Sequence, residues 1–184
     1  MAVRIFAFLS LIAVLTLARF VPHPPNFSPM LALALFAGAK APKRWLAYVA
    51  PVAALWLSDL EIGAHDMMII TGLALLLATG VGALTEKNMS EASIAKKVLG
   101  WAGAGLASSV IFFLITNFFV WQTSKLYPLT GDGLWTCFVM ALPFFHHQIL
   151  STWMFSSVAF AAWALFDSLK VRRSFFCLRR VKHE

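Results

Sequence analysis

The stretch Val98–Trp121, VLGWAGAGLASSVIFFLITNFFVW, decides the class of fold because it runs for 24 residues without a charge. A helix of about 20 apolar residues is long enough to cross the hydrocarbon core of a bilayer. Similar apolar stretches lie near residues 4–21, 28–39, 45–58, 67–85 and 133–169. The sequence therefore predicts an all-α, polytopic membrane protein whose 184 residues form a single transmembrane domain.

The composition points to the same class. Hydrophobic residues make up 60% of the chain and charged residues 12%, and the mean hydropathy of +0.79 lies outside the usual range of soluble domains. The net charge of +7 fits the basic cytoplasmic loops of a membrane protein better than nucleic-acid binding. The two cysteines, Cys137 and Cys177, form no CxxC motif, so neither a disulfide framework nor a zinc site is predicted.

The basic residues gather in alternate loops, and this orients the chain. Cytoplasmic loops are enriched in Lys and Arg. Placing these loops in the cytoplasm leaves only Arg19 and Lys125 for the outer side and puts both termini inside. The basic residues assigned to the cytoplasmic side are Arg4, Lys40, Lys43, Arg44, Lys87, Lys96, Lys97, Lys170, Arg172, Arg173, Arg179, Arg180 and Lys182.

Six spans follow from this orientation, because both termini inside require an odd number of crossings after Lys125, and three do not fit in 133–169. We assign the last crossing to residues 149–169 and expect residues 133–146 to form an additional outer or re-entrant helix, ended by Pro143 and the polar run that follows it. The first span is expected to be a retained helix, since no small-x-small cleavage site follows it. The predicted helices are 4–21, 28–39, 45–58, 67–85, 98–121 and 149–169, with a basic cytoplasmic tail over 170–184.

The second span is short, and an unusual segment precedes it. A helix over 28–39 reaches only about 20 Å, less than the roughly 30 Å of hydrocarbon. Residues 21–29, VPHPPNFSP, contain four prolines that favour an extended backbone. Non-helical backbone at membrane depth is tolerated only where protein covers it or water reaches it. The sequence predicts an outward-facing cavity rimmed by this segment; the alternative is a surface loop in a thinned bilayer.

Polar and aromatic residues assigned to the outer side suit a small ligand. Asn117 and Trp121 share a helix face. The amide could equally form a hydrogen bond between helices, and the tryptophan could belong to the aromatic belt at the membrane interface. Asp59 is a carboxylate entering the membrane, where such groups are usually paired. The predicted ligand-binding residues are His23, Asn26, Asp59, Asn117, Trp121, Tyr127 and His146. No metal site and no cofactor are predicted, because the adjacent His146 and His147 should diverge by about 100° on a helix.

Small residues recur at helical spacing on the cytoplasmic half. Ala34, Gly38, Gly100 and Ala104 are predicted to let helices approach closely, either within this chain or against a partner helix. The basic tail is expected to contact anionic membrane lipid. No Ser/His/Asp order, HExxH motif or glycine-rich phosphate loop occurs, so no catalytic residue and no enzymatic activity are expected.

Several motifs together resemble an uncharacterised family of small bacterial integral membrane proteins, over about residues 20–165. These motifs are Pro22-His23-Pro24-Pro25-Asn26-Phe27-Ser28-Pro29, Leu57-Ser58-Asp59, Thr116-Asn117-Phe118-Phe119-Val120-Trp121, Tyr127-Pro128 and Ala141-Leu142-Pro143-Phe144-Phe145. The family has Arg-Asn after Pro-Phe-Phe, whereas this chain has His146-His147. More distantly, the six-helix layout with both termini inside is similar to the substrate-capture (S) components of energy-coupling-factor transporters.

The resemblance implies a substrate-binding, S-component-like subunit in the inner (cytoplasmic) membrane that takes up a vitamin or another micronutrient from the outer side. It also implies an energy-coupling membrane subunit and ATPases as partners, besides membrane lipid and the small-molecule ligand, and no nucleic acid. One alternative is a non-catalytic structural or assembly subunit of a larger membrane complex. A further alternative is an intramembrane enzyme that uses Asp59 or a histidine.

Overall fold

The computed structural model describes the backbone of residues 1–181 and the side chains of residues 1–169. This part of the chain is helical throughout, with only short connections. The elements are α1 (Ala2–Leu17), the short 3-10 helix η1 (Ala18–Phe20), α2 (Met30–Lys40), α3 (Arg44–Ile62), α4 (Met68–Met89), α5 (Ile94–Thr123) and α6 (Gly131–Val181). Five helices are long and apolar enough to cross a membrane, and α2 is shorter. The predicted all-α, polytopic membrane class is confirmed.

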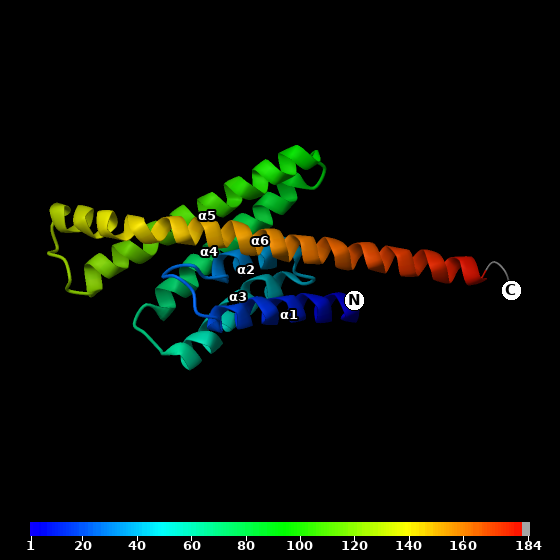
Figure 1. Cartoon of the computed structure of the whole chain (residues 1–184), viewed down its shortest axis with the longest axis horizontal. Helices are drawn as coiled ribbons and strands as arrows, with labels where there is room; N and C mark the ends of the chain where they lie inside the picture. Colours follow the sequence, from blue (N-terminus) through cyan, green and yellow to red (C-terminus); the bar gives the residue numbers. More distant parts are fainter. Residues whose placement is uncertain (182–184) are drawn as a thin grey trace.

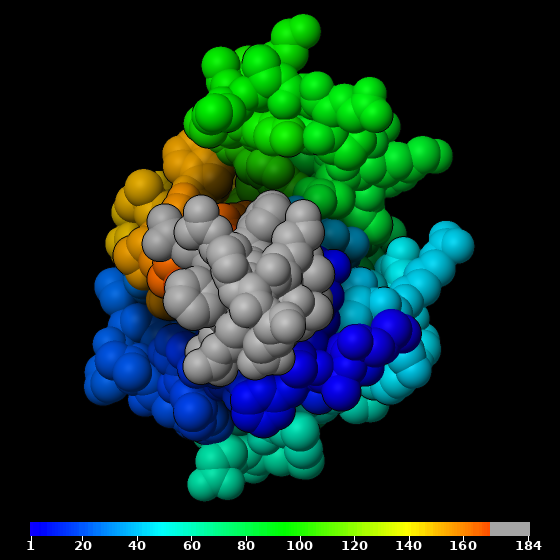
Figure 2. All heavy atoms as spheres, turned by 90° about the vertical axis from the view of Figure 1, so that its right-hand side faces the viewer, coloured from blue at the N-terminus to red at the C-terminus, as the bar shows by residue number. Residues whose placement is uncertain are grey.

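The connections between helices fall at two ends of the molecule (Figure 1). The N-terminus, the α2–α3 and α4–α5 connections and the end of α6 lie toward one end. The α1–α2, α3–α4 and α5–α6 connections lie toward the other end. Figure 2, which looks onto the first end, shows residues of α1 and of the α4–α5 region facing the viewer. The loops rich in Lys and Arg therefore share an end with the N-terminus, as the predicted alternation requires.

The short helix α2 forms the centre of the bundle. Its residues Met30–Ala37 are all buried, and it packs against each of the other five α-helices. A helix that is apolar on every side has no face that needs water, so it lies inside. Phe36 packs against three rings, with centroid distances of 5.8 Å to Phe8, 5.7 Å to Phe160 and 5.6 Å to Trp163.

Glycines let α2 and α4 approach closely. A Cβ on Gly38 would lie 2.0 Å from the carbonyl oxygen of Thr79, and one on Gly82 would lie 2.2 Å from that of Leu35. Ala34, another residue predicted for helix packing, is completely buried within the chain. These two backbones therefore meet at a distance that no larger residue permits.

The two other residues predicted for helix packing lie on α5. A Cβ on Gly100 would lie 2.9 Å from the Sδ atom of Met89, and Ala104 is only 5% exposed. In the structure, all four predicted packing residues thus contact helices of the same chain rather than a free surface.

One boundary in the last third of the chain differs from the prediction. The separate outer or re-entrant helix over 133–146 is absent, because α6 runs without a break from Gly131 to Val181. Pro143 lies inside this helix, where it withholds one N–H from the carbonyl of Val139. Packing against α5 on both sides of the proline holds the helix together, since Phe113 lies 5.6 Å from Phe138 and 4.6 Å from Phe145 between ring centroids.

The polar residues after Pro143 also remain helical. Gln148, which is 5% exposed, donates from Nε2 to the carbonyl of Ser109 on α5 at 2.9 Å. Beyond the expected span, α6 continues through the predicted basic tail as far as Val181, and the tail residues 182–184 lie outside the described part of the chain.

Candidate ligand-binding cavity

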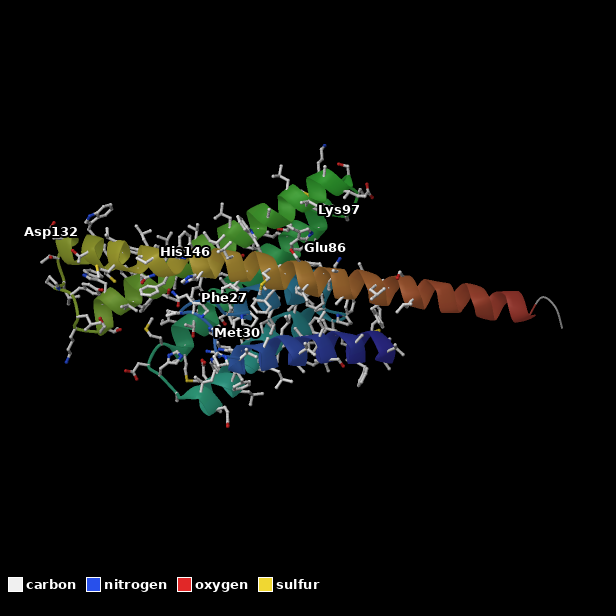
Figure 3. The ribbon with its side chains drawn as sticks, viewed as in Figure 1. Phe27, Met30, Glu86, Lys97, Asp132 and His146 are labelled. Atoms are coloured by element: carbon white, nitrogen blue, oxygen red, sulfur yellow. The ribbon has the colours of Figure 1, made fainter. Side chains whose placement is uncertain are left out.

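The proline-rich segment between α1 and α2 folds back over the bundle in a fixed shape. The N–H of Phe27 donates to the carbonyl of Pro24 at 3.0 Å, and Asn26 has a positive φ of 61° that turns the chain. Phe27 packs edge-on against Phe155 of α6, with ring centroids 5.9 Å apart. Figure 3 shows Phe27 and Met30 in this central region, where the segment enters α2 beside α6. The segment is therefore held by turns and by a ring contact.

A cavity of about 260 Å³ lies at the start of α2, beside this segment. A cavity beside this segment was predicted, and its volume lies just below the usual range of ligand pockets, so only a small ligand would fit. Its lining residues come from η1, the proline-rich segment, the α3–α4 connection and the helices α2 to α6: Arg19, His23, Asn26, Ser28, Met30, Leu31, Leu55, His65, Thr71, Leu75, Phe112 and Gln148.

The lining of the cavity combines apolar and polar side chains. Leu31, Leu55, Leu75 and Phe112 supply apolar surface, whereas the histidines, Asn26, Ser28, Thr71 and Gln148 supply donors and acceptors. The first N–H groups of a helix have no acceptor within the helix; at α2, the N–H of Met30 reaches only the Ser28 hydroxyl, at 3.5 Å. A molecule with a polar group and a small apolar body matches this lining.

An ion pair supports one wall of the cavity, where Arg19 lines the cavity and Asp59 lies behind it. Asp59 on α3 is 1% exposed and pairs with Arg19, which follows α1 and is 16% exposed. Arg19 also donates to the Ser58 hydroxyl at 2.5 Å and to the carbonyl of Leu55 at 3.3 Å. The pairing keeps a carboxylate neutralised in a setting where a lone charge is costly.

His65 reaches the same carboxylate from the α3–α4 connection, with 3.4 Å between its Nε2 and an oxygen of Asp59. Neither oxygen of Asp59 accepts a well-aligned hydrogen bond from the described residues, so its contact with Arg19 is an ion pair without a hydrogen bond, and His65 lies within reach of its second oxygen. The carboxylate thus lies behind two cavity-lining residues, Arg19 and His65, and positions both.

The structure brings together three of the seven predicted ligand-binding residues. His23 and Asn26 line the cavity, and Asp59 lies directly behind it. Arg19 was missed because a lone arginine at the end of an apolar span carries no signal of its pairing with Asp59. His65 and Gln148 are polar residues in segments far apart along the chain, and no sequence pattern links them to one cavity.

The other four predicted residues do not line the cavity. The amide of Asn117 donates to the carbonyl of Phe113 in its own helix at 2.8 Å, and the indole of Trp121 donates to the carbonyl of Pro128 at 2.9 Å. Tyr127 is half-buried in the α5–α6 connection. Of these residues, Trp121 ties α5 to the α5–α6 connection, whereas the Asn117 amide bonds within α5.

His146 lies on α6 and is exposed. Its ring centroid lies 4.0 Å from that of His147, so the two rings are closer together than the expected divergence of about 100° suggested. Among the residues that the structure describes, no three His, Cys, Asp or Glu side chains lie together as potential metal ligands.

The fold defines a small polytopic membrane protein with a cavity at the start of α2. The chain belongs to the family described as "Family of unknown function (DUF6580)", which matches residues 1–174. No curated protein matches the chain, and no solved structure does.

Proposed function

We propose that this protein is a substrate-binding membrane subunit, similar to an S component, for the uptake of a vitamin or another micronutrient. The cavity at the start of α2 carries this proposal. It is enclosed by helices on several sides, and it combines an apolar wall with convergent polar groups. Binding sites for small molecules in proteins have this composition.

In this proposal the protein lies in the inner membrane, and the orientation predicted from the basic loops supports a cavity near the outer face. The cavity end carries the three connections that are poor in Lys and Arg. Because α2 spans only about 16 Å as an 11-residue helix, the cavity lies below the outer surface, with the proline-rich segment above it. A ligand arriving from outside would meet His23 and Asn26 of that segment first.

The proposal assigns binding, and no covalent chemistry, to this chain. Transport across the membrane then needs a source of energy, for which an energy-coupling membrane subunit and ATPases are the proposed partners. The ion pair between Arg19 and Asp59 keeps the cavity wall in place while the ligand enters and leaves.

Native mass spectrometry of the protein, extracted in a mild detergent, tests the proposal. We expect a small molecule that is retained by the wild type. It should be lost in His23→Ala, which removes a cavity side chain, and kept in the control Asn117→Ala, whose side chain bonds within its own helix. A protein that is always empty, or a ligand lost equally in both variants, would contradict the proposal.

A second candidate function is that of a structural or assembly subunit, and one observation favours it. Gly103 and Ala107 lie four residues apart on an exposed face of α5, and a Cβ on Gly103 would meet nothing within 4 Å. A small-residue face of this kind permits close approach of a partner helix. Gly103→Leu should then release a stoichiometric partner from the purified complex, without affecting the cavity ligand.

A further inference from the structure

A second hollow lies on the other half of the molecule, between the first half of α5 and the middle of α6. Its volume is about 390 Å³, and it shares no residue with the cavity at α2. In Figure 1, α5 crosses α6 and its N-terminal half diverges toward the α4–α5 turn. The groove between these helices is lined by Ile94, Lys97, Val98, Trp101, Ala102, Trp153, Ser156, Ser157 and Phe160.

The walls of this α5–α6 groove are aromatic and fixed. The indole N–H of Trp153 donates to the carbonyl of Ala102 at 3.0 Å. Its ring lies over Gly105, where a Cβ would come within 2.7 Å of the Trp153 ring. Trp101 packs against Phe160 with 4.3 Å between ring centroids. These contacts keep the groove open as a slot with apolar sides.

A lysine side chain supplies a positive charge at one end of the slot. Lys97 lines the groove, and no side chain of residues 1–169 forms an ion pair with it. Figure 3 shows Glu86 in the same region as Lys97, near the α4–α5 turn. Glu86 forms an ion pair with Lys40, with 2.5 Å between the charged atoms. Ser156 adds a buried hydroxyl that has no hydrogen-bond partner among the described residues. The groove is therefore amphipathic, with one charged end.

We infer that the α5–α6 groove binds an anionic phospholipid, with its phosphate at Lys97 and an acyl chain between Trp101, Trp153 and Phe160. The mouth of the groove belongs to the surface that faces the bilayer, since Ile94 and Val98 are 83% and 66% exposed. Lys97 lies in the first turn of α5, next to the α4–α5 connection that the basic residues assign to the cytoplasmic side, and the leaflet there carries anionic lipids. Charge complementarity and the long apolar slot together select this ligand.

Lipid titration followed by native mass spectrometry tests the inference on the full chain. The probes are palmitoyl-oleoyl phosphatidylglycerol and phosphatidylcholine with the same chains. We expect one phosphatidylglycerol to bind more tightly than phosphatidylcholine. Lys97→Gln should weaken phosphatidylglycerol binding about fivefold. The matched control is Lys96→Gln, because Lys96 is the exposed neighbour and does not line the groove; it should leave binding unchanged.

A third variant addresses the apolar part of the slot. Ala102→Phe places a ring in the slot and should weaken the binding of both lipids alike. The melting temperature of this variant shows whether it remains folded. If it does not fold, the comparison of Lys96→Gln with Lys97→Gln decides. Equal losses in Lys96→Gln and Lys97→Gln, equal affinity for the two lipids, or a groove occupied by a helix of a partner protein would overturn the inference. These outcomes leave the proposed function unaffected, because the cavity at α2 is a separate site.

Discussion

Arg19 and Asp59 form a buried ion pair that joins the end of α1 to α3, although they are far apart in sequence. Asp59 is almost inaccessible, and Arg19 is further fixed by Ser58 and by the carbonyl of Leu55. This pair connects the first helix to the wall of the cavity. Its geometry leads to the first prediction.

Removing one member of this pair should destabilise the protein. Asp59→Asn leaves the charge of Arg19 without its counter-ion, and breaking a buried pair in this way costs about 3–5 kcal/mol. For a chain of this size, we expect the melting temperature in detergent to fall by roughly 6 °C or more. The measurement is a thermal unfolding curve, in which the folded fraction left after heating is quantified by size-exclusion chromatography.

The control for this prediction removes both charges. Arg19→Met combined with Asp59→Leu should recover most of the loss, because apolar residues often replace a buried pair without cost. If the double variant loses as much stability as the single variants Arg19→Met and Asp59→Leu lose together, the charges do not act as a pair.

The contact between α2 and α4 predicts opposite effects for two neighbouring glycines. Gly82→Ala places a methyl group 2.2 Å from the carbonyl of Leu35, so the helices must separate, at a cost of about 1–3 kcal/mol. Gly80→Ala meets open space on the same helix and should raise helix stability by up to about 1 kcal/mol. Melting temperatures of the two variants would distinguish them, and equal values would contradict the close crossing.

Pro143 in the middle of α6 should be replaceable. In Pro143→Ala, the new N–H can bond to the carbonyl of Val139, and a proline in a helix interior costs about 3 kcal/mol in soluble helices. We expect an unchanged or higher melting temperature and an unchanged elution volume. A large loss of stability would instead show that the proline sets a bend required for packing against Phe113.

The orientation of the chain can be tested with two exposed serines at opposite ends. In a background with both cysteines replaced by serine, Ser124→Cys should react with a membrane-impermeant maleimide added to intact cells, because the α5–α6 connection is assigned to the outside. Ser90→Cys, in the basic α4–α5 connection, should react only after the membrane is disrupted. The reverse pattern would invert the topology and place the cavity end inside.

The sequence alone was sufficient for the class of protein and for most of the helices. Long uncharged stretches such as Val98–Trp121 leave few alternatives to a membrane helix, because every backbone polar group in a bilayer must be bonded within the protein. The short length of the second apolar segment and its four preceding prolines also predicted a cavity. These features are local, so they can be read along the chain.

The tertiary structure decided the path of α6 and the membership of the cavity. Pro143 predicted a break, but ring contacts between α5 and α6 on both sides of it hold the helix continuous. Arg19, His65 and Gln148 line the cavity. Asn117 and Trp121 do not line it, and their side chains donate hydrogen bonds to the backbone carbonyls of Phe113 and Pro128. Which polar groups meet depends on how helices distant in sequence pack around α2, and no local pattern contains that information.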